Sequence, residues 1–187
     1  VENKPGLLVK ELLDANVFIT TRWPNKSIIA PKLKLIQIPA AGYDNIHFES
    51  VPKGCKVSNT FEHEIPMAEY CILSMLESDI NLNKMDAQLR KGDWSGYSSS
   101  TSFHGELYNR NLAIIGFGHI GKEISKRANA FGMNILIYDK YKTSKKYRNV
   151  SKSYLVKHSD VISVHVHLDN NTKNLININL LKKCFRS

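Results

Sequence analysis

The hydrophobic pattern changes near Pro66. Before it, short runs of β-branched and aromatic residues, bounded by turn residues, predict three strands, at residues 15–21, 33–42 and 56–60. From Pro66 onward, apolar side chains recur near helical spacing and predict a helix that runs to about Arg90 and ends at Gly92. The chain therefore begins with a strand-rich segment that is followed by a long helix.

Strands and helices alternate beyond the Gly- and Ser-rich segment 92–110. The apolar runs predict strands at residues 112–115, 133–138 and 161–166. Helices are predicted between and after them, at residues 120–131, 153–158 and 172–183. This alternation is typical of parallel βαβ units, so we expect an α/β fold with a doubly wound parallel sheet.

A glycine motif joins the first of these strands to its helix. Residues 116–121 read Gly-Phe-Gly-His-Ile-Gly, which is the GxGxxG pattern of dinucleotide-binding turns. Gly116 would allow the tight turn, Gly118 would let the backbone approach a pyrophosphate, and Gly121 would let the helix pack closely on the strand. The alternative is a glycine turn without a ligand, but the strand before the motif and the helix after it favour a cofactor site.

The start of the helix supplies donors for the phosphates. Backbone N–H groups at His119 and Ile120 belong to the first helical turn, where they lack partners within the helix. We expect the His119 side chain to point to solvent. Asp139 ends the next strand, eighteen residues past Gly121, and would accept hydrogen bonds from the adenosine ribose.

The charge of Asp139 favours one cofactor. A 2′-phosphate would meet a negative charge there, so the sequence predicts NAD rather than NADP. Nearby lysines could weaken this discrimination; they are Lys140, Lys145 and Lys146.

Composition indicates a globular protein with an uneven charge. The net charge is +9, and residues 140–187 hold 11 Lys and Arg against 2 acids, whereas residues 1–139 are neutral. The excess could be a polyanion surface or a solvated basic face. We favour the solvated face and expect no nucleic-acid partner, because the cations are scattered along the chain without a recognition motif.

Three cysteines argue against disulfide and metal frameworks. Cys55, Cys71 and Cys184 are odd in number and lack CxxC spacing, so we expect no metal and a cytoplasmic location. No apolar stretch approaches the length of a membrane helix, so no membrane association is expected.

Five segments together resemble the D-isomer-specific 2-hydroxyacid dehydrogenases. The resemblance covers the chain from about Leu12 to Lys183. The segments are KLIQIPAAGYDNI, VSNTFEHEIPMAEYCILSML, RKGDWSG, ELYNRNLAIIGFGHIGKEISKRANAFGMNILIYDK and HSDVISVHVHLDNNTKNLIN.

The resemblance implies two domains and a reaction. Residues 1–64 would be part of a flavodoxin-like substrate domain, and residues 65–187 an incomplete Rossmann domain that binds NAD. Such enzymes transfer a hydride between the nicotinamide and a D-2-hydroxy acid or 2-oxo acid. Ala41 and Gly42 would hold the substrate carboxylate through their N–H groups. The loop after the strand at 161–166 would line the adenosine side of the cofactor through His165, Val166, His167 and Thr172. The helix from Met67 and the Trp94 turn would form a homodimer arm.

Departures from the family pattern leave the activity open. His63 stands where many relatives carry Asn, and His167 stands where they usually carry Pro. The family's catalytic Arg, Glu and His match no residue here, and Arg186 does not fit the Arg position, so we assign no catalytic residue. The sequence is expected to be a family member truncated at both ends. The alternative is a non-catalytic protein that binds NAD and senses its redox state.

Overall fold

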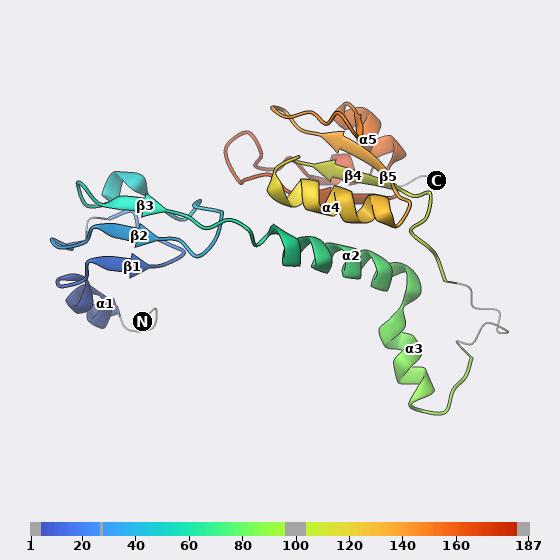
Figure 1. Ribbon diagram of the computed structural model, residues 1–187, viewed down its shortest axis with the longest axis horizontal. Coiled ribbons are helices and arrows are strands. Elements are labelled where there is room, and N and C mark those ends of the chain that lie inside the picture. Colours follow the sequence, from blue (N-terminus) through green and yellow to red (C-terminus); the bar gives the residue numbers. More distant parts are fainter. Residues whose placement is uncertain (1–4, 27, 96–103, 183–187) are drawn as a thin grey trace. The chain divides into compact units, whose positions relative to one another are not determined.

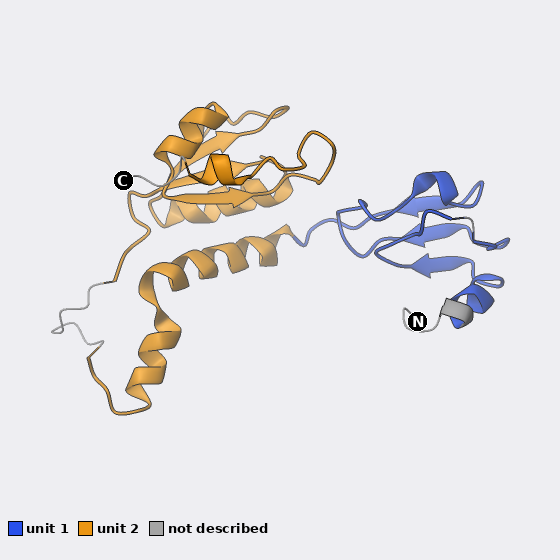
Figure 2. Cartoon of the chain, turned by 180° about the vertical axis from the view of Figure 1, so that it is seen from behind, with its two compact units in different colours: residues 1–63 blue, residues 64–187 orange. Residues whose placement is uncertain are grey.

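A computed structural model describes residues 5–26, 28–95 and 104–182 of the chain. The chain divides into two compact units, residues 1–63 and residues 64–187 (Figures 1 and 2).

Unit 1 is built on a small parallel sheet. Its strands lie in the order β1 (Val17–Ile19), β2 (Leu35–Gln37) and β3 (Lys56–Ser58). The central residue of β2, Ile36, pairs with Phe18 on one side and Val57 on the other. Helix α1 (Pro5–Leu12) and the 3-10 turn η1 (Phe48–Ser50) complete the unit. The three predicted strands are confirmed, whereas α1 was not predicted.

A tryptophan anchors the core of unit 1. Trp23 is fully buried and packs among aliphatic side chains that include Leu12 and Ile36. Its indole N–H donates to the Ser50 carbonyl oxygen at 3.1 Å. This bond satisfies the polar atom that burial of a tryptophan would otherwise leave without a partner.

Unit 2 contains a four-stranded parallel sheet. Its order is β6 (Arg148–Asn149), β5 (Asn134–Tyr138), β4 (Asn111–Ile115) and β7 (Val161–Val164). β4 is central, and the chain crosses over from β5 and β6 to the opposite side of β4 to form β7. The predicted doubly wound parallel sheet is confirmed, with β6 as a short strand that the sequence did not predict.

Alternate residues of β4 contribute to two cores. Leu112 and Ile114 pack with Ile124 of α4 (His119–Ala130), whereas Ala113 and Ile115 pack with α5 (Lys152–His158). All four β4 side chains are fully buried. Figure 1 shows α4 and α5 on opposite faces of the sheet, as expected where successive side chains of a strand point to opposite faces.

The predicted long helix is divided in two. The structure has α2 (Glu64–Ile80) and α3 (Leu82–Leu89), with Asn81 between them in the left-handed region at φ 56°. Asparagine tolerates this conformation better than most residues, so it permits the change in direction. The prediction of one continuous helix to Arg90 was therefore wrong at this residue.

The predicted helix at residues 172–183 was also wrong over most of its length. Only α6 (Ile178–Leu181) is helical, and residue 183 lies outside the described part. Asn174 has φ 59°, and the side chain of Asn177 accepts a hydrogen bond from the Leu180 N–H at 3.0 Å. Asparagine side chains compete with helical backbone bonds, which starts the helix late.

None of the helices in the described ranges combines the length and apolar character needed to cross a membrane.

Candidate dinucleotide-binding site

The turn between β4 and α4 requires glycine at Gly116. Its φ is +97°, which side-chain-bearing residues rarely adopt, and its N–H donates to the Tyr138 carbonyl oxygen at 2.9 Å. A Cβ atom here would lie 2.4 Å from the carbonyl oxygen of His165. Gly116 therefore brings the ends of three neighbouring strands together at one point.

Gly121 sets the distance between α4 and the sheet. A Cβ atom at this position would lie 2.2 Å from the Gly116 carbonyl oxygen and 3.1 Å from Cγ2 of Ile114. Only a residue without a side chain fits this contact, as the GxGxxG pattern predicts.

Gly118 has a different environment from its two neighbours in the motif. Its φ is −79°, which any residue adopts, and no protein atom lies within 4 Å of the place where a Cβ would stand. Neither backbone strain nor packing therefore explains a glycine here. Gly118 is the N-cap of α4 and provides no side-chain cap, so the first turn of this 12-residue helix can offer N–H groups and a positive dipole end to an anion.

Asp139 closes the other side of the turn. Its carboxylate accepts from the N–H groups of Phe117 at 2.6 Å, Tyr141 at 2.8 Å and Lys142 at 2.9 Å. Burial opposes ionisation, but the N–H donors of Tyr141, Phe117 and Lys142 and the Lys142 charge outweigh it, so the pKa of Asp139 lies below its usual value. Asp139 is therefore an anion at neutral pH.

The loop after β7 lies against the glycine turn. The His165 N–H donates to the Ile115 carbonyl oxygen at 2.7 Å, and a Cβ on Gly116 would lie 3.0 Å from Cγ1 of Val166. The His165 ring nitrogen Nε2 lies 2.7 Å from the Ser163 hydroxyl. Burial lowers the pKa of His165, so the imidazole is neutral at neutral pH.

Thr172 organises the rest of this loop. Its hydroxyl donates to the His167 carbonyl oxygen and accepts from the Asp169 N–H at 2.8 Å. The structure thus links Thr172 to His167 and places His165 and Val166 beside Gly116.

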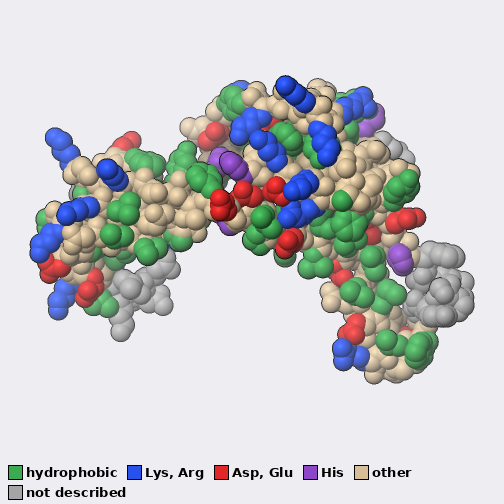
Figure 3. Space-filling view, viewed as in Figure 1, with side chains coloured by type: hydrophobic (Ala, Val, Ile, Leu, Met, Phe, Trp, Pro, Cys, Tyr) green, Lys and Arg blue, Asp and Glu red, His purple; other side chains and the backbone are tan. Residues whose placement is uncertain are grey.

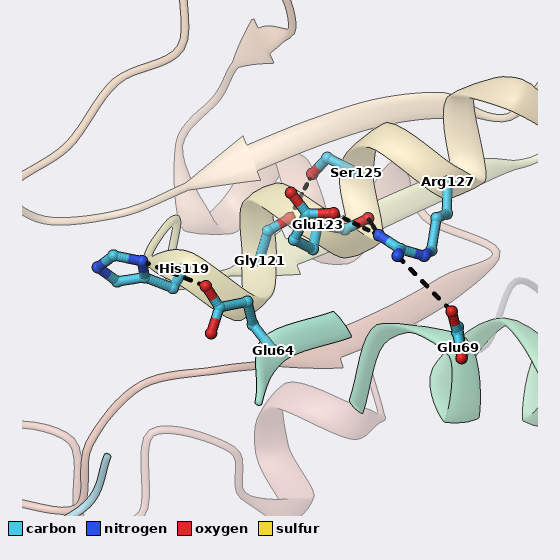
Figure 4. A network of polar contacts seen from close by, with 7 residues as sticks. All are labelled: Glu64, Glu69, His119, Gly121, Glu123, Ser125 and Arg127. Atoms are coloured by element: carbon cyan, nitrogen blue, oxygen red, sulfur yellow. Dashed lines mark hydrogen bonds and ion pairs between the residues drawn. The ribbon is translucent and has the colours of Figure 1, made fainter. Parts of the chain in front are cut away.

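Polar contacts position α4 against α2 (Figure 4). Nδ1 of His119 lies 3.6 Å from Oε1 of Glu64, so their pairing is ionic only when the imidazole is protonated. Arg127 pairs with Glu123 one turn earlier on α4 and lies 3.8 Å from Oε1 of Glu69 on α2. These contacts fix the helix whose first turn forms the site. The sequence analysis did not predict the contacts of Glu64 and Glu69 with α4. Among these contacts, only the pair of Glu123 and Arg127 has a sequence indication, its i,i+4 spacing.

Unit 1 carries the predicted substrate loop directly after β2. The Asn59 side-chain amide donates to the Ala41 carbonyl oxygen at 2.9 Å and so fixes the peptide between Ala41 and Gly42. Within the described residues, no hydrogen bond is donated by the N–H groups of Ala41 or Gly42. Two adjacent donors are thus available to a carboxylate.

The residues that the structure describes contain no group of three or more His, Cys, Asp and Glu that could hold a metal ion.

The sequence matches a family model over residues 72–187, described as the NAD-binding domain of D-isomer-specific 2-hydroxyacid dehydrogenases. D-3-phosphoglycerate dehydrogenase of Methanocaldococcus jannaschii is 35% identical over an alignment that covers 98% of this chain and 38% of that protein. Hydroxypyruvate reductase of Thermotoga maritima is 38% identical, over 78% of this chain and 48% of that protein. The chain spans about half the length of the curated relatives it matches.

Solved structures share this fold. The 3-phosphoglycerate dehydrogenase of Entamoeba histolytica, solved with NAD⁺, aligns with TM-score 0.74 and 29% identity over 94% of this chain and 54% of its own. The D-lactate dehydrogenase of Aquifex aeolicus, solved with NAD and lactic acid, aligns with TM-score 0.76 and 28% identity over 94% of this chain and 55% of its own. The matched residues include the whole glycine turn, Asp139 and the loop after β7. The chain belongs to the D-isomer-specific 2-hydroxyacid dehydrogenase family, and its unit 2 carries the NAD-binding domain of that family.

Proposed function

We propose that this chain forms the NAD-binding part and a portion of the substrate domain of an oxidoreductase. The reaction is hydride transfer between a nicotinamide cofactor and a small D-2-hydroxy acid or 2-oxo acid. Residues 1–64 would contribute to the substrate domain, and residues 65–187 to the Rossmann domain. The observation that carries the proposal is Gly118, whose missing side chain leaves open space at the start of α4. Calorimetric titration of NAD⁺ into the chain tests it, and saturable binding of one NAD⁺ per chain is the expected result.

Each side of the turn has a role in holding NAD. The N–H groups at Gly118, His119 and Ile120 receive the pyrophosphate, and Gly116 and Gly121 bring strand and helix close enough to form the cradle. Oδ2 of Asp139 keeps one acceptor site for a ribose hydroxyl, because a carboxylate has about four acceptor sites and three N–H groups use three of them. The adenosine side is lined by the loop of His165, Val166, His167 and Thr172.

The chain's own residues would orient the reactants. NAD, when bound, supplies the hydride chemistry. The adjacent N–H groups of Ala41 and Gly42 hold the carboxylate of the acid, and Asn59 keeps their peptide in place. By the family resemblance, the groups that move the proton match none of these 187 residues.

Asp139 should set the choice between NAD and NADP. Replacing it with Ala removes the charge that repels a 2′-phosphate, so the preference for NAD should fall by about tenfold, or roughly 1.4 kcal/mol. Asp139→Asn, which keeps a side-chain acceptor for the turn, should give a similar loss of preference. The measurement is calorimetric titration of each variant with both cofactors. Equal affinity of the unsubstituted chain for NAD⁺ and NADP⁺ would contradict the assignment.

We propose that α2 also forms a homodimer surface. One face of α2 packs on α4 through Ala68 and Ile72, whereas the other exposes Tyr70 by 71% and Leu73 by 61%. A helix that is apolar on both faces is typically buried on both. A second copy of the chain would cover Tyr70 and Leu73 and gain about 1.5–3 kcal/mol for each fully buried apolar side chain.

Positive charges introduced on the exposed face of α2 should separate the subunits. The double change Tyr70→Lys and Leu73→Lys should convert the dimer into a monomer in light scattering at micromolar concentration. Ile29→Lys is the control, because Ile29 is equally exposed, at 72%, but lies in unit 1. A monomeric unsubstituted chain with cooperative unfolding would rule out the dimer.

We expect the 187 residues alone to bind NAD without turning over 2-oxo acids at a useful rate. Hydride transfer to a carbonyl leaves an alkoxide that needs a proton, and a positioned acid contributes roughly 10² to 10⁴-fold. NADH oxidation with glyoxylate, hydroxypyruvate and pyruvate is the assay, with the Aquifex aeolicus D-lactate dehydrogenase as positive control. Robust turnover would show that these residues already contain the proton donor.

We propose a cellular location from the free state of the cysteines. Cys55 and Cys71 are both free, and Cys184 lies outside the described residues. Free cysteines are typical of a reducing compartment, so we propose a cytoplasmic protein.

A further inference from the structure

The segment directly after β5 is strongly basic. Residues 140–158 contain no Asp or Glu and seven cationic side chains: Lys140, Lys142, Lys145, Lys146, Arg148, Lys152 and Lys157. These cations are spread along the sequence, which by itself favours a solvated face. The fold changes that interpretation, because it gathers them.

A stack of side chains joins β6 to α5. The guanidinium of Arg148, on β6, lies 4.5 Å from the ring centroid of Tyr154 on α5. The Tyr154 ring in turn stacks on His158, with centroids 3.9 Å apart and an interplanar angle of 8°. Arg148 therefore lies against α5, and we call residues 140–157, which hold these cations, the basic surface. In Figure 3, Lys and Arg side chains gather over the part of unit 2 where Figure 1 places α5.

The backbone that presents these cations is held by its own hydrogen bonds. Asn149 accepts from the Ser144 N–H at 2.8 Å and donates to the Ser144 carbonyl oxygen at 2.6 Å. The Ser144 hydroxyl accepts from the N–H groups of Lys146 at 3.1 Å and Tyr147 at 3.0 Å. Lys145, Lys146 and Arg148 are exposed on this ordered turn, so less entropy is lost when they bind a ligand.

Few carboxylates neutralise the basic surface. The charge of Asp139 acts on Lys142 and that of Asp169 acts on Lys140. Among the described residues, no ion pair joins a carboxylate to Lys145, Lys146 or Arg148. No carboxylate in the described ranges therefore neutralises these three cations directly, although Lys146 and Arg148 lie over the rings of Tyr147 and Tyr154.

An exposed aromatic ring lies at the start of the same surface. Tyr141 is 81% exposed, and Nζ of Lys140 lies 5.4 Å from the centroid of its ring. Exposed aromatic rings beside cations are the combination on which bases of single-stranded nucleic acids stack while their phosphates are neutralised.

We propose that the basic surface binds single-stranded nucleic acid. Lys145, Lys146 and Arg148 contact phosphates, and a base stacks on Tyr141. The phosphate contacts at Lys145, Lys146 and Arg148 do not use the glycine turn, although Tyr141 borders the cofactor site because its N–H donates to Asp139.

The test is fluorescence anisotropy with a labelled 20-nucleotide oligo-U and an abasic strand of the same length. We expect oligo-U to bind more tightly than the abasic strand, and its affinity to fall roughly tenfold or more between 50 and 200 mM salt, as about three phosphate contacts require. The double change Lys145→Glu and Lys146→Glu should weaken binding at least tenfold. Lys53→Glu with Lys56→Glu, two exposed lysines of unit 1 with the same charge change, should have much less effect.

Two further variants test whether a base stacks on Tyr141 and whether the strand binds at the glycine turn instead. The melting temperature of each variant is checked by circular dichroism. Tyr141→Ala should weaken oligo-U binding severalfold and leave the abasic strand unchanged. Gly118→Val should keep oligo-U binding. The proposal is overturned if oligo-U does not bind at 50 mM salt, if the two double variants lose affinity equally, or if the abasic strand binds as tightly as oligo-U. Loss of oligo-U binding in Gly118→Val would place the strand at the glycine turn instead and would equally overturn it.

Discussion

Gly118→Val should abolish dinucleotide binding while the chain stays folded. The branched side chain would fill the open space at the start of α4, which the pyrophosphate needs for its approach to the backbone. We expect the dissociation constant for NAD⁺ to rise by at least about 100-fold, which corresponds to roughly 2.7 kcal/mol. Since Gly118 has φ −79° and no protein atom near its would-be Cβ, the free energy of unfolding should fall by only about 1 kcal/mol, the cost of a poor N-cap residue.

Two measurements on one sample decide this prediction. Calorimetry gives the affinity for NAD⁺, and thermal unfolding followed by circular dichroism shows that the variant is folded. Gly118→Ala is the graded control, because a single methyl group should weaken binding less than the branched side chain does. Unchanged affinity in a folded Gly118→Val variant would mean that the glycine serves only the turn.

Gly121→Ala should produce the opposite result, a damaged fold. The added methyl carbon would lie 2.2 Å from the Gly116 carbonyl oxygen, and this backbone atom cannot move aside as the end of a flexible side chain could. Overpacking of this kind costs about 1–3 kcal/mol or more. The higher helix propensity of alanine, worth about 1 kcal/mol, offsets only part of that cost. We expect a net loss of about 2 kcal/mol in the free energy of unfolding.

Chemical denaturation of Gly121→Ala beside Gly118→Ala provides the matched comparison. Both variants add one methyl group to a glycine of the same motif, but only the first meets backbone atoms. Gly121→Ala should show the lower denaturation midpoint. Coinciding midpoints would mean that Gly121 does not lie in close contact with the backbone of Gly116.

The fold could be predicted where the pattern is periodic and local. The alternation of strands and helices from β4 to β7 specified a parallel sheet, because βαβ units at this spacing leave few other arrangements. The hydrophobic pattern did not predict the structure where an asparagine sets the backbone conformation. The left-handed conformation of Asn81 divides α2 from α3, and Asn174 and Asn177 delay α6 until residue 178. Such single-residue choices depend on hydrogen bonds that a hydrophobic pattern does not encode.

The candidate site, too, could be predicted from the sequence only in part. The glycines were predicted because each task needs a missing side chain, and the structure distinguishes Gly118 from the two glycines that packing requires. The contacts of α2 with α4 were not predictable, because Glu69 and Arg127 are 58 residues apart in sequence and meet only when α2 packs on α4. The contact between Arg148 and Tyr154 on the basic surface was not predictable for the same reason, since these residues come together only through the packing of α5 on the sheet.

Calorimetric titration of the folded chain with NAD⁺ tests the central claim most directly, because that claim is that the glycine turn of unit 2 holds the cofactor. We predict saturable binding of one NAD⁺ per chain, tighter than the binding of NADP⁺ and absent in Gly118→Val. No measurable binding of NAD⁺ to a chain that unfolds cooperatively would contradict the account.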